Sequence, residues 1–236
     1  MEHYLYLALN IGTILFPLLW SFEPKVTYYK KWGNLFPAMI ITAVFFLVWD
    51  HWFTDMGVWG FNDRYLSGIT LGNLPLGEYL FFVTVPFSCI FIYEVLLYYK
   101  PEGLQFKQVK PITFGLIVLL LVLAGLHTDK WYTAVNFSVV AMLLAIHYFM
   151  FRTALLGRFY VFYLIHLIPF LIVNGALTGA FTPEPVVFYD DTENLGIRVF
   201  TIPIEDFVYS MGLMLMNVSL YEFFRRRKTI ALANGS

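Results

Sequence analysis

Apolar residues along the chain are gathered into seven long stretches separated by polar loops. The hydrocarbon core of a bilayer is about 30 Å thick, and about 20 apolar residues are needed to cross it as a helix. Two of the loops, 54–78 and 181–203, are longer than the others. The pattern predicts an all-α integral membrane protein with seven transmembrane helices, over residues 3–21, 35–53, 79–99, 111–128, 131–151, 158–180 and 204–224.

Lysine and arginine residues indicate which ends of these helices face the cytoplasm, because short cytoplasmic loops carry an excess of both. With the N-terminus outside the membrane, 12 of the 15 basic residues fall on the inner side, and only Arg64, Lys130 and Arg198 fall outside. We therefore expect a multi-pass protein in membrane lipid, with an outside N-terminus and a cytoplasmic C-terminus. The basic residues on the inner side are Lys25, Lys30, Lys31, Lys100, Lys107, Lys110, Arg152, Arg158, Arg225, Arg226, Arg227 and Lys228.

Composition agrees with a membrane protein and gives no support to several kinds of cofactor site. Hydrophobic residues make up 59% of the chain and charged residues 13%, whereas a soluble domain has about 25% charged residues. There is one cysteine, and the five histidines are scattered. Glycine-rich dinucleotide and phosphate-binding motifs are missing. We expect no metal, nucleotide, flavin or iron–sulfur cofactor and no nucleic-acid partner, whereas a homo-oligomer stays compatible with the sequence.

The second half of the chain repeats the first. Residues 61–94 align with residues 189–222 at a constant offset of 128 and without a gap. Upstream of these segments the match continues with small shifts in the offset. Equivalent pairs include Tyr6 and Tyr132, Asn10 and Asn136, Asp50 and Asn174, Thr54 and Thr178, Glu78 and Asp206, and Glu94 and Glu222.

The repeat predicts how the helices are grouped. Helices one to three form one copy, helices five to seven form the other, and the fourth restores the direction of travel so that both copies face the same way. An axis along the membrane normal then brings Glu78 and Asp206 to the same depth on the same side. The predicted units are 1–100 for the first repeat, 101–129 for the linking helix, 130–228 for the second repeat and 229–236 for a tail.

Each copy carries a proline followed by an acid where its third helix is expected to begin. The two motifs are Pro75-Leu76-Gly77-Glu78-Tyr79 and Pro203-Ile204-Glu205-Asp206-Phe207. Proline and an acid also suit the first turn of any helix, which would account for a single motif of this kind. Two copies, and further acids inside apolar spans, favour a functional site.

The acids fall into two groups by depth. Glu94 lies ~24 Å from Glu78 along its helix, so these two residues cannot share chemistry. We expect Glu94 and Glu222 to serve anchoring and ion pairing near the cytoplasmic side. The predicted outer cluster is Asp50, Glu78, Glu205 and Asp206.

A cluster of carboxyl groups in an apolar, aromatic bundle suits the protonation of an alkene. Loss of hydration disfavours the charged form of a carboxyl group, and two neighbouring carboxyl groups disfavour double ionisation. A neutral acid of this kind can donate a proton at ordinary pH, and aromatic faces can stabilise the resulting carbocation. The rings expected to do so, each of which packing alone could also explain, are Trp49, Trp52, Tyr79 and Phe207.

Spaced motifs in both copies carry a resemblance to a known family. They are Trp49-Asp50, Val58-Trp59-Gly60-Phe61-Asn62, Leu74-Pro75-Leu76-Gly77-Glu78-Tyr79-Leu80-Phe81-Phe82, Pro86, Tyr93-Glu94, Leu177-Thr178, Pro185-Val186-Val187-Phe188-Tyr189-Asp190-Asp191, Gly196-Ile197-Arg198, Ile202-Pro203-Ile204-Glu205-Asp206-Phe207 and Leu220-Tyr221-Glu222. Over nearly the whole chain, the sequence resembles the flavin-independent, membrane-embedded lycopene β-cyclases, in the form that fuses two half-size subunits in tandem.

The resemblance implies a reaction and a set of residues. The ψ ends of lycopene, or of a related carotenoid, would be cyclised to β-rings by an intramolecular lyase or isomerase reaction without redox change or cofactor, giving γ-carotene and β-carotene. Glu78 and Asp206 would form the catalytic pair across the repeat axis, with Glu205 in support. We expect Asp50, Asn174 and Arg198 to support these acids or to bind substrate.

The first copy departs from the family's motif at one position. The motif reads Pro-x-Glu-[Glu/Asp] in both copies of the family's members. Glu205 and Asp206 complete it in the second copy, whereas Gly77 replaces the first glutamate in the first copy and leaves Glu78 alone.

Other functions are weighed against this one. A cyclase or hydratase of another carotenoid, such as one with a longer chain, shares the protonation step, and the sequence separates these activities poorly. A small-solute transporter can have the same three-one-three arrangement, but the Pro-Gln motif of seven-helix sugar carriers is missing from the first and fifth helices. A retinal-binding protein needs a lysine in the last helix, and 204–224 contains none.

Overall fold

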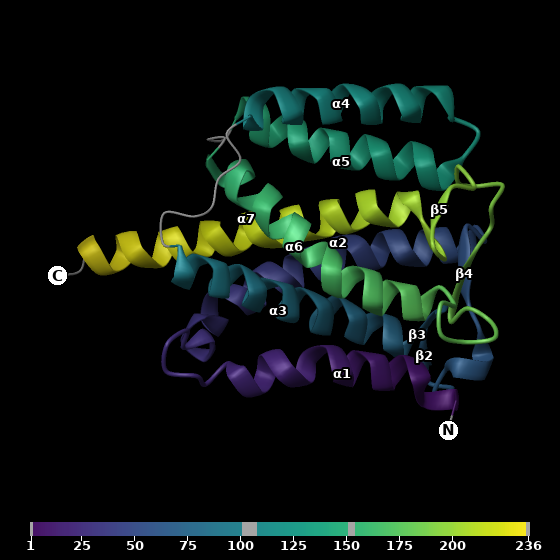
Figure 1. The fold of residues 1–236 in the computed structure, drawn as a ribbon, viewed down its shortest axis with the longest axis horizontal. Coiled ribbons are helices and arrows are strands. Elements are labelled where there is room, and N and C mark those ends of the chain that lie inside the picture. The colour runs from purple at the N-terminus through teal and green to yellow at the C-terminus, as the bar shows by residue number, and fades with distance from the viewer. Residues whose placement is uncertain (1, 101–107, 151–153, 235–236) are drawn as a thin grey trace.

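The computed structural model describes residues 2–100, 108–150 and 154–234, and in this part of the chain seven long helices form a bundle (Figure 1). All seven are long and apolar enough to cross a membrane, so the predicted fold class is confirmed. Three short turns of 3-10 helix add to them, at Glu2–Tyr4, Tyr28–Lys31 and Asp63–Tyr65. The long helices are α1 (Leu5–Trp20), α2 (Trp32–Asp55), α3 (Leu76–Tyr99), α4 (Val109–Leu126), α5 (Trp131–Phe149), α6 (Ala154–Leu177) and α7 (Ile204–Asn234).

The last helix is longer than the sequence pattern predicts. α7 continues through Asn234, instead of ending at residue 224, and includes most of the residues assigned to a tail. Hydrophobicity marks only the part of a helix that crosses the bilayer. Arg225, Arg226 and Arg227 end the apolar pattern, but arginine is itself a good helix former, so the helix continues. The other six helices begin and end within four residues of the predicted bounds.

The two termini lie at opposite ends of the bundle (Figure 1). An odd number of membrane crossings requires this arrangement. The short strands and both long loops lie at the end that carries the N-terminus, which is called the loop end below. Two of the basic residues expected on the opposite side, Lys107 and Arg152, lie outside the described residues.

Helices that are equivalent in the repeat make equivalent contacts. α1 packs against α3 in the first copy, as α5 packs against α7 in the second. Between the copies, α2 packs against α7, and α3 packs against α6. α4 lies at the edge of the bundle against α5 (Figure 1). The helices that carry the motif acids, α3 and α7, are therefore in the middle of the bundle.

Paired strands at the loop end mark where the copies meet. β1 (Trp59–Phe61) is antiparallel to β4 (Val187–Tyr189), with Gly60 opposite Phe188. Gly60 and Phe188 are also equivalent in the repeat alignment, so a pseudo-two-fold axis passes between them. Two hairpins lead directly into α3 and α7, and they pair β2 (Thr70–Leu71) with β3 (Leu74–Pro75) and β5 (Arg198–Val199) with β6 (Ile202–Pro203).

At the opposite end of the bundle, α3 and α7 exchange buried hydrogen bonds about the same axis. The Tyr93 hydroxyl donates to Glu222 at 2.7 Å, and the Tyr221 hydroxyl donates to Glu94 at 2.6 Å. Lys31 forms an ion pair with Glu94. These two acids therefore join the copies to each other, in addition to the ion pairing expected of them.

Candidate functional site

A cavity of about 80 Å³ lies at the loop end, where α3 and α7 begin. Three buried carboxyl groups line it: Asp50 from the last turns of α2, Glu78 from the first turn of α3 and Asp206 from the first turn of α7. The remaining wall is mainly apolar and aromatic. Its tyrosine and tryptophan rings are Tyr6, Trp59, Tyr132, Tyr189 and Tyr209.

The local sequence explains why two of these acids lie at this depth. Pro75 directly precedes the first residues of α3, and Pro203 directly precedes α7. Proline has a fixed φ and no N–H group, so it is tolerated where a helix begins. Glu78 and Asp206 thereby fall in the first helical turn, where the helix dipole favours negative charge. The motif is thus a helix start and also the source of the cavity's acids.

In the first copy, two carboxyl groups lie side by side. Asp50 and Glu78 are near enough to influence each other electrostatically, and the Trp59 indole also interacts with Asp50. The Tyr6 hydroxyl donates to Glu78. No hydrogen-bond donor among the described residues reaches Oδ2 of Asp50. Asp50, expected in the outer cluster as a residue that supports the catalytic pair or binds substrate, is therefore a wall residue of the cavity and a neighbour of Glu78.

In the second copy, a single carboxyl group is held by three donors. Oδ1 of Asp206 accepts a hydrogen bond of 2.5 Å from Tyr132, and Oδ2 accepts from Asn174 at 2.7 Å and from Tyr189 at 2.9 Å. Burial, reinforced by the neighbouring Asp206 carboxyl, raises the pKa of Tyr189 well above its usual value, so this hydroxyl keeps its proton. Three donors of this kind suit a carboxylate, which only accepts.

The two halves of the cavity differ at the positions that face the acid. Asn174 on α6 is equivalent to Asp50 on α2, and Tyr189 on β4 is equivalent to Phe61 on β1. Each difference gives the second copy a donor that the first copy lacks. The same scaffold therefore surrounds Asp206 with three donors and leaves the first-copy acids with each other, the Tyr6 hydroxyl and the Trp59 indole.

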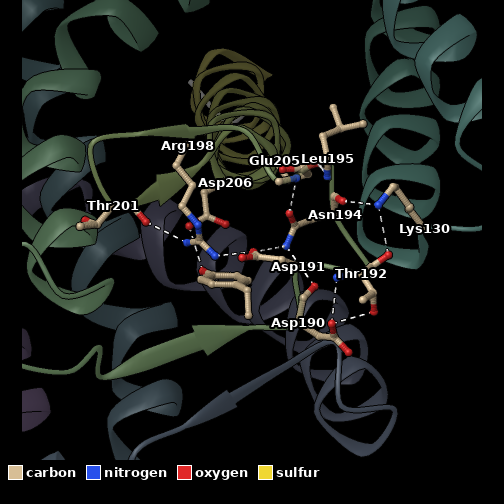
Figure 2. Close-up of polar contacts among 12 residues, drawn as sticks. Lys130, Asp190, Asp191, Thr192, Asn194, Leu195, Arg198, Thr201, Glu205 and Asp206 are labelled. Carbon is tan, nitrogen blue, oxygen red and sulfur yellow. Dashed lines mark hydrogen bonds and ion pairs between the residues drawn. The ribbon is translucent and has the colours of Figure 1, made fainter.

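Glu205 does not line the cavity but ties α7 to its surroundings (Figure 2). Its Oε1 accepts hydrogen bonds from the Thr133 hydroxyl at 2.7 Å and from the Leu195 backbone N–H at 2.8 Å. Asn136 donates to the Glu205 backbone carbonyl at 2.7 Å. Successive helix residues point in different directions, so Glu205 holds α5 and the loop before β5, while the next residue, Asp206, reaches the cavity.

Gly77, at the position equivalent to Glu205, leaves room for a tyrosine ring. A Cβ atom at Gly77 would lie 2.5 Å from the nearest ring carbon of Tyr6. Asn10 donates to the Gly77 backbone carbonyl at 3.0 Å and so fixes the approach of α1 to α3. Because Gly77 has no side chain where the motif has glutamate, the Tyr6 ring can pack against α3 with its hydroxyl on Glu78.

Arg198 is connected to the site through Tyr189. Its guanidinium lies 5.8 Å from the centre of the Tyr189 ring. It also pairs with Asp191 at 2.5 Å and donates to the Thr201 carbonyl at 2.9 Å. Tyr189 in turn donates to Asp206. Arg198 therefore supports the loop that contains Tyr189, although Arg198 itself does not line the cavity.

The four rings expected around the acids lie outside the cavity. Trp49 packs against the outer side of a ring in the cavity wall, and Trp52 is 45% exposed. Tyr79 donates to the Leu71 carbonyl at 3.0 Å, and Phe207 packs 4.9 Å from another ring on α6. A helix turns by about 100° per residue, so the residue that follows each motif acid points away from it.

The tyrosines that do contact the acids could have been found from the repeat. Tyr6 and Tyr132 are equivalent in the alignment, four residues before an equivalent pair of asparagines. Both donate to a motif acid. A duplicated polar residue in the first helix of each copy was therefore the signal for a partner of the duplicated acid.

The cavity is equipped for proton transfer in an apolar setting. It offers one pair of neighbouring carboxyl groups, one carboxyl group with three donors, and several aromatic faces. A site that gives one proton and takes another needs two such groups, one within reach of the substrate carbon that gains a proton and one within reach of the carbon that loses one. Among the described residues, no three His, Cys, Asp or Glu side chains converge in a way that could hold a metal ion.

A family model described as lycopene cyclase matches the chain twice, over residues 3–96 and 129–224. The first match spans α1 to α3 with Asp50 and Glu78, and the second spans α5 to α7 with Asp206. No curated protein and no solved structure gives a significant match. The two matches reproduce the internal repeat and include every carboxyl group of the cavity, and the chain therefore belongs to the lycopene cyclase family, as a multi-pass membrane enzyme that cyclises a carotenoid.

Proposed function

We propose that the chain converts the ψ ends of lycopene into β-rings, giving γ-carotene after one cyclisation and β-carotene after two. The reaction is an isomerisation without redox change. The observation that carries this proposal is the unequal surroundings of the three carboxyl groups. Asp50 and Glu78 lie against each other, whereas Asp206 accepts three hydrogen bonds.

The Asp50–Glu78 pair is the proton donor in this mechanism. Two carboxyl groups in contact and away from water cannot both ionise, so one proton is shared between them. Transfer of that proton to the terminal double bond of lycopene breaks an O–H bond, forms a C–H bond and leaves a tertiary carbocation. Both carboxyl groups are then ionised, and the carbocation formed beside them balances the second negative charge.

Ring closure follows without a further reagent. The neighbouring double bond of the same carotenoid attacks the cation, which forms the ring C–C bond and moves the positive charge to a second tertiary carbon. Aromatic faces attract such a cation through the negative charge on their π-systems. Trp59 and Tyr209 are the wall residues best suited to this, because neither donates a hydrogen bond to Asp206.

Asp206 is the base. Its three donors support a carboxylate that is positioned before substrate arrives. It removes a proton from the ring carbon next to the cation, and the electron pair of that C–H bond becomes the ring double bond. One proton enters the substrate and one leaves it, so the product is an isomer and no oxidant or reductant is consumed. The proton taken up by Asp206 must return to the Asp50–Glu78 pair before the next turnover. The acid pair is thus Asp50 with Glu78, and Asp206 acts separately.

Pigment chromatography of lycopene-producing cells that express the chain tests this proposal. We expect γ-carotene and β-carotene, and the same products from detergent-purified protein without added flavin or nicotinamide. Unchanged lycopene at normal protein abundance, or a strict requirement for reduced flavin, would contradict the mechanism. A hydroxylated product would instead identify a hydratase, in which water captures the same carbocation. Conversion of only a longer-chain carotenoid would identify a cyclase for that substrate.

We also propose that the N-terminus and the cavity face the outer side of the membrane. The support is the distribution of basic residues, 12 of 15 of which fall on the opposite side. A reporter fused to the C-terminus is expected to be active only in the cytoplasm. Activity of that reporter on the outer side would reverse the orientation and leave the chemistry of the cavity unchanged.

A further inference from the structure

A second cavity, of about 360 Å³ and largely apolar, adjoins the carboxyl cavity between α1, α3 and α6. Small-molecule sites have volumes of about 300–1,000 Å³, so the adjoining cavity is of that size and the carboxyl cavity is not. The smaller cavity has room for only the reacting end of a long molecule. Five residues line both cavities: Phe81, Val85, His166, Phe170 and Asn174.

The apolar cavity lies next to the surface that faces lipid. Phe16 of α1 lines it and is 54% exposed. On α6, Pro169 and Val173 line it, and the residues beside them, Ile168 and Ile172, are 65% and 60% exposed. The side of the cavity between α1 and α6 therefore faces the hydrocarbon of the bilayer rather than the polar loop end.

The equivalent position between α2 and α7 is filled by aromatic side chains. Trp49 stands where α6 has Val173, and Tyr209 stands where α3 has Phe81. Trp49 is 5% exposed, and its ring lies 5.2 Å from that of Tyr209 and 5.7 Å from that of Phe46. An indole occupies far more space than an isopropyl group. The space beside Trp49 is therefore filled by side chains, whereas the equivalent space beside Val173 is the apolar cavity.

We infer that the apolar cavity receives the polyene chain of the carotenoid, which enters sideways from the bilayer between α1 and α6. This inference rests on the proposed function, because it requires the end of that chain to reach Glu78 and Asp206 in the adjoining cavity. Sideways entry keeps the polyene in apolar surroundings throughout. With the Trp49 side closed, one end of the carotenoid enters at a time, so the monocyclic product must leave and reverse before its second end reacts.

Val173→Trp tests the route, because it copies onto the hollow side the residue that closes the other side. We expect cyclised carotenoid to fall about tenfold or more, the change that a loss of about 1.4 kcal/mol in binding produces. Ile172→Trp is the matched control, since it places the same ring on the lipid-facing surface one residue away, and conversion is expected to stay near normal. Normal conversion by Val173→Trp at normal abundance would overturn the inference.

A binding measurement separates the route from the reaction. Cys89 is the chain's one cysteine and lines the apolar cavity. We expect β-carotene, a polyene with no end left to cyclise, to slow the modification of Cys89 by N-ethylmaleimide several-fold in detergent-purified protein. If Cys89 reacts too slowly to follow, Phe16→Cys in a Cys89→Ala background provides an exposed thiol on the same cavity. Met142→Cys in that background is the control, because Met142 is the equivalent of Phe16 on α5 and is 53% exposed.

The outcomes distinguish the two proposals. Protection of the cavity thiol with no protection at Met142→Cys supports the route, even if lycopene is not converted, in which case the proposed reaction alone is wrong. Conversion of lycopene together with equal modification rates with and without β-carotene, at both cavity positions, would show that the polyene lies elsewhere.

Discussion

The two repeats hold an acid at the same place by the same means and surround it differently. In both, a tyrosine from the first helix donates to the acid in the first turn of the third helix. The second helix then contributes Asp50 to the first copy and Asn174 to the second. A carboxyl group can carry a proton to be given away, whereas an amide facing a carboxylate can only donate a hydrogen bond.

The two unlike copies show how a duplicated unit can supply both the acid and the base of one reaction. Identical copies would give both acids the same surroundings, so nothing in the structure would fix which of them carries the proton and which accepts one. Replacing one carboxyl by an amide, and Phe61 by Tyr189, gives one copy the donors that a base requires. The cavity on the two-fold axis then brings the two unlike halves together.

Asp206→Asn is expected to have the largest effect. The amide is nearly the same size but accepts a proton far less readily than a carboxylate, so we expect turnover to fall by about 10³-fold or more, within the range for loss of acid–base catalysis. Turnover per unit of membrane-inserted protein is the measurement. Asp63→Asn, on an exposed loop, is the control and should be normal. Near-normal turnover by Asp206→Asn at normal abundance would remove Asp206 from the mechanism.

Asp50→Asn makes the first copy like the second. Glu78 would then face an amide, the shared proton would be lost, and we expect turnover to fall by about 10²-fold or more. Glu78→Gln should lower turnover similarly, because it removes the other member of the pair.

The double variant Asp50→Asn/Asn174→Asp moves the acid pair to the second copy, and it should recover part of the activity if the cavity requires only one pair and one separate carboxylate. Full activity of Asp50→Asn alone would show that Glu78 needs no acidic neighbour.

Gly77→Glu restores the family's motif in the first copy and is expected to lower activity rather than raise it. Its Cβ would lie 2.5 Å from the Tyr6 ring, so the ring must move and weaken its hydrogen bond to Glu78. We expect a loss of about tenfold, the equivalent of about 1.4 kcal/mol and typical of one buried hydrogen bond. Gly77→Ala carries the same Cβ without the carboxyl group and should share most of the loss. Higher turnover by Gly77→Glu would mean that a missing acid, and not space, limits the first copy.

The spans, the repeat and the depth of the acids could be predicted because each depends only on the order of residues along the chain. A run of apolar residues long enough to cross a bilayer forms a helix in lipid, where every backbone N–H and C=O group must be paired. A constant offset of 128 between the copies places Glu78 and Asp206 at one level. The end of α7 was missed because polar helical residues beyond the bilayer carry no apolar signal.

The partners of the acids depend on how each helix is rotated about its axis, and the sequence contains little information about this. A helix that is apolar on every side has no stripe to show which face meets its neighbours. Tyr79 was therefore expected beside Glu78 in the site, although it points toward the hairpin carbonyl of Leu71. The sequence places Asp50 and Glu78 in one cluster by depth, but which acids of that cluster are neighbours depends on the packing of α2 against α3.

Glu205→Gln is expected to have the smallest effect, although Glu205 belongs to the same motif as Asp206. Its Oε1 accepts from Thr133 and from the Leu195 backbone, and an amide oxygen at that position can accept both bonds. The first copy has glycine there, so no proton transfer depends on the position in that half. We expect turnover within about threefold of normal and only a small fall in thermal stability, since both hydrogen bonds are kept but are weaker with a neutral acceptor.

Glu205→Ala provides the contrast, because it removes the oxygen that accepts both hydrogen bonds and leaves the Leu195 N–H without its partner. It should therefore lower the thermal midpoint in detergent more than Glu205→Gln does, while turnover of the protein that remains folded changes little. The reason is geometric: Glu205 faces α5 and the loop before β5, whereas the substrate is expected on the opposite side of the α7 turn, beside Asp206. If Glu205→Gln instead lost as much turnover as Asp206→Asn at normal abundance, Glu205 would take part in proton transfer, and the division between a first-copy acid pair and a second-copy base would be wrong.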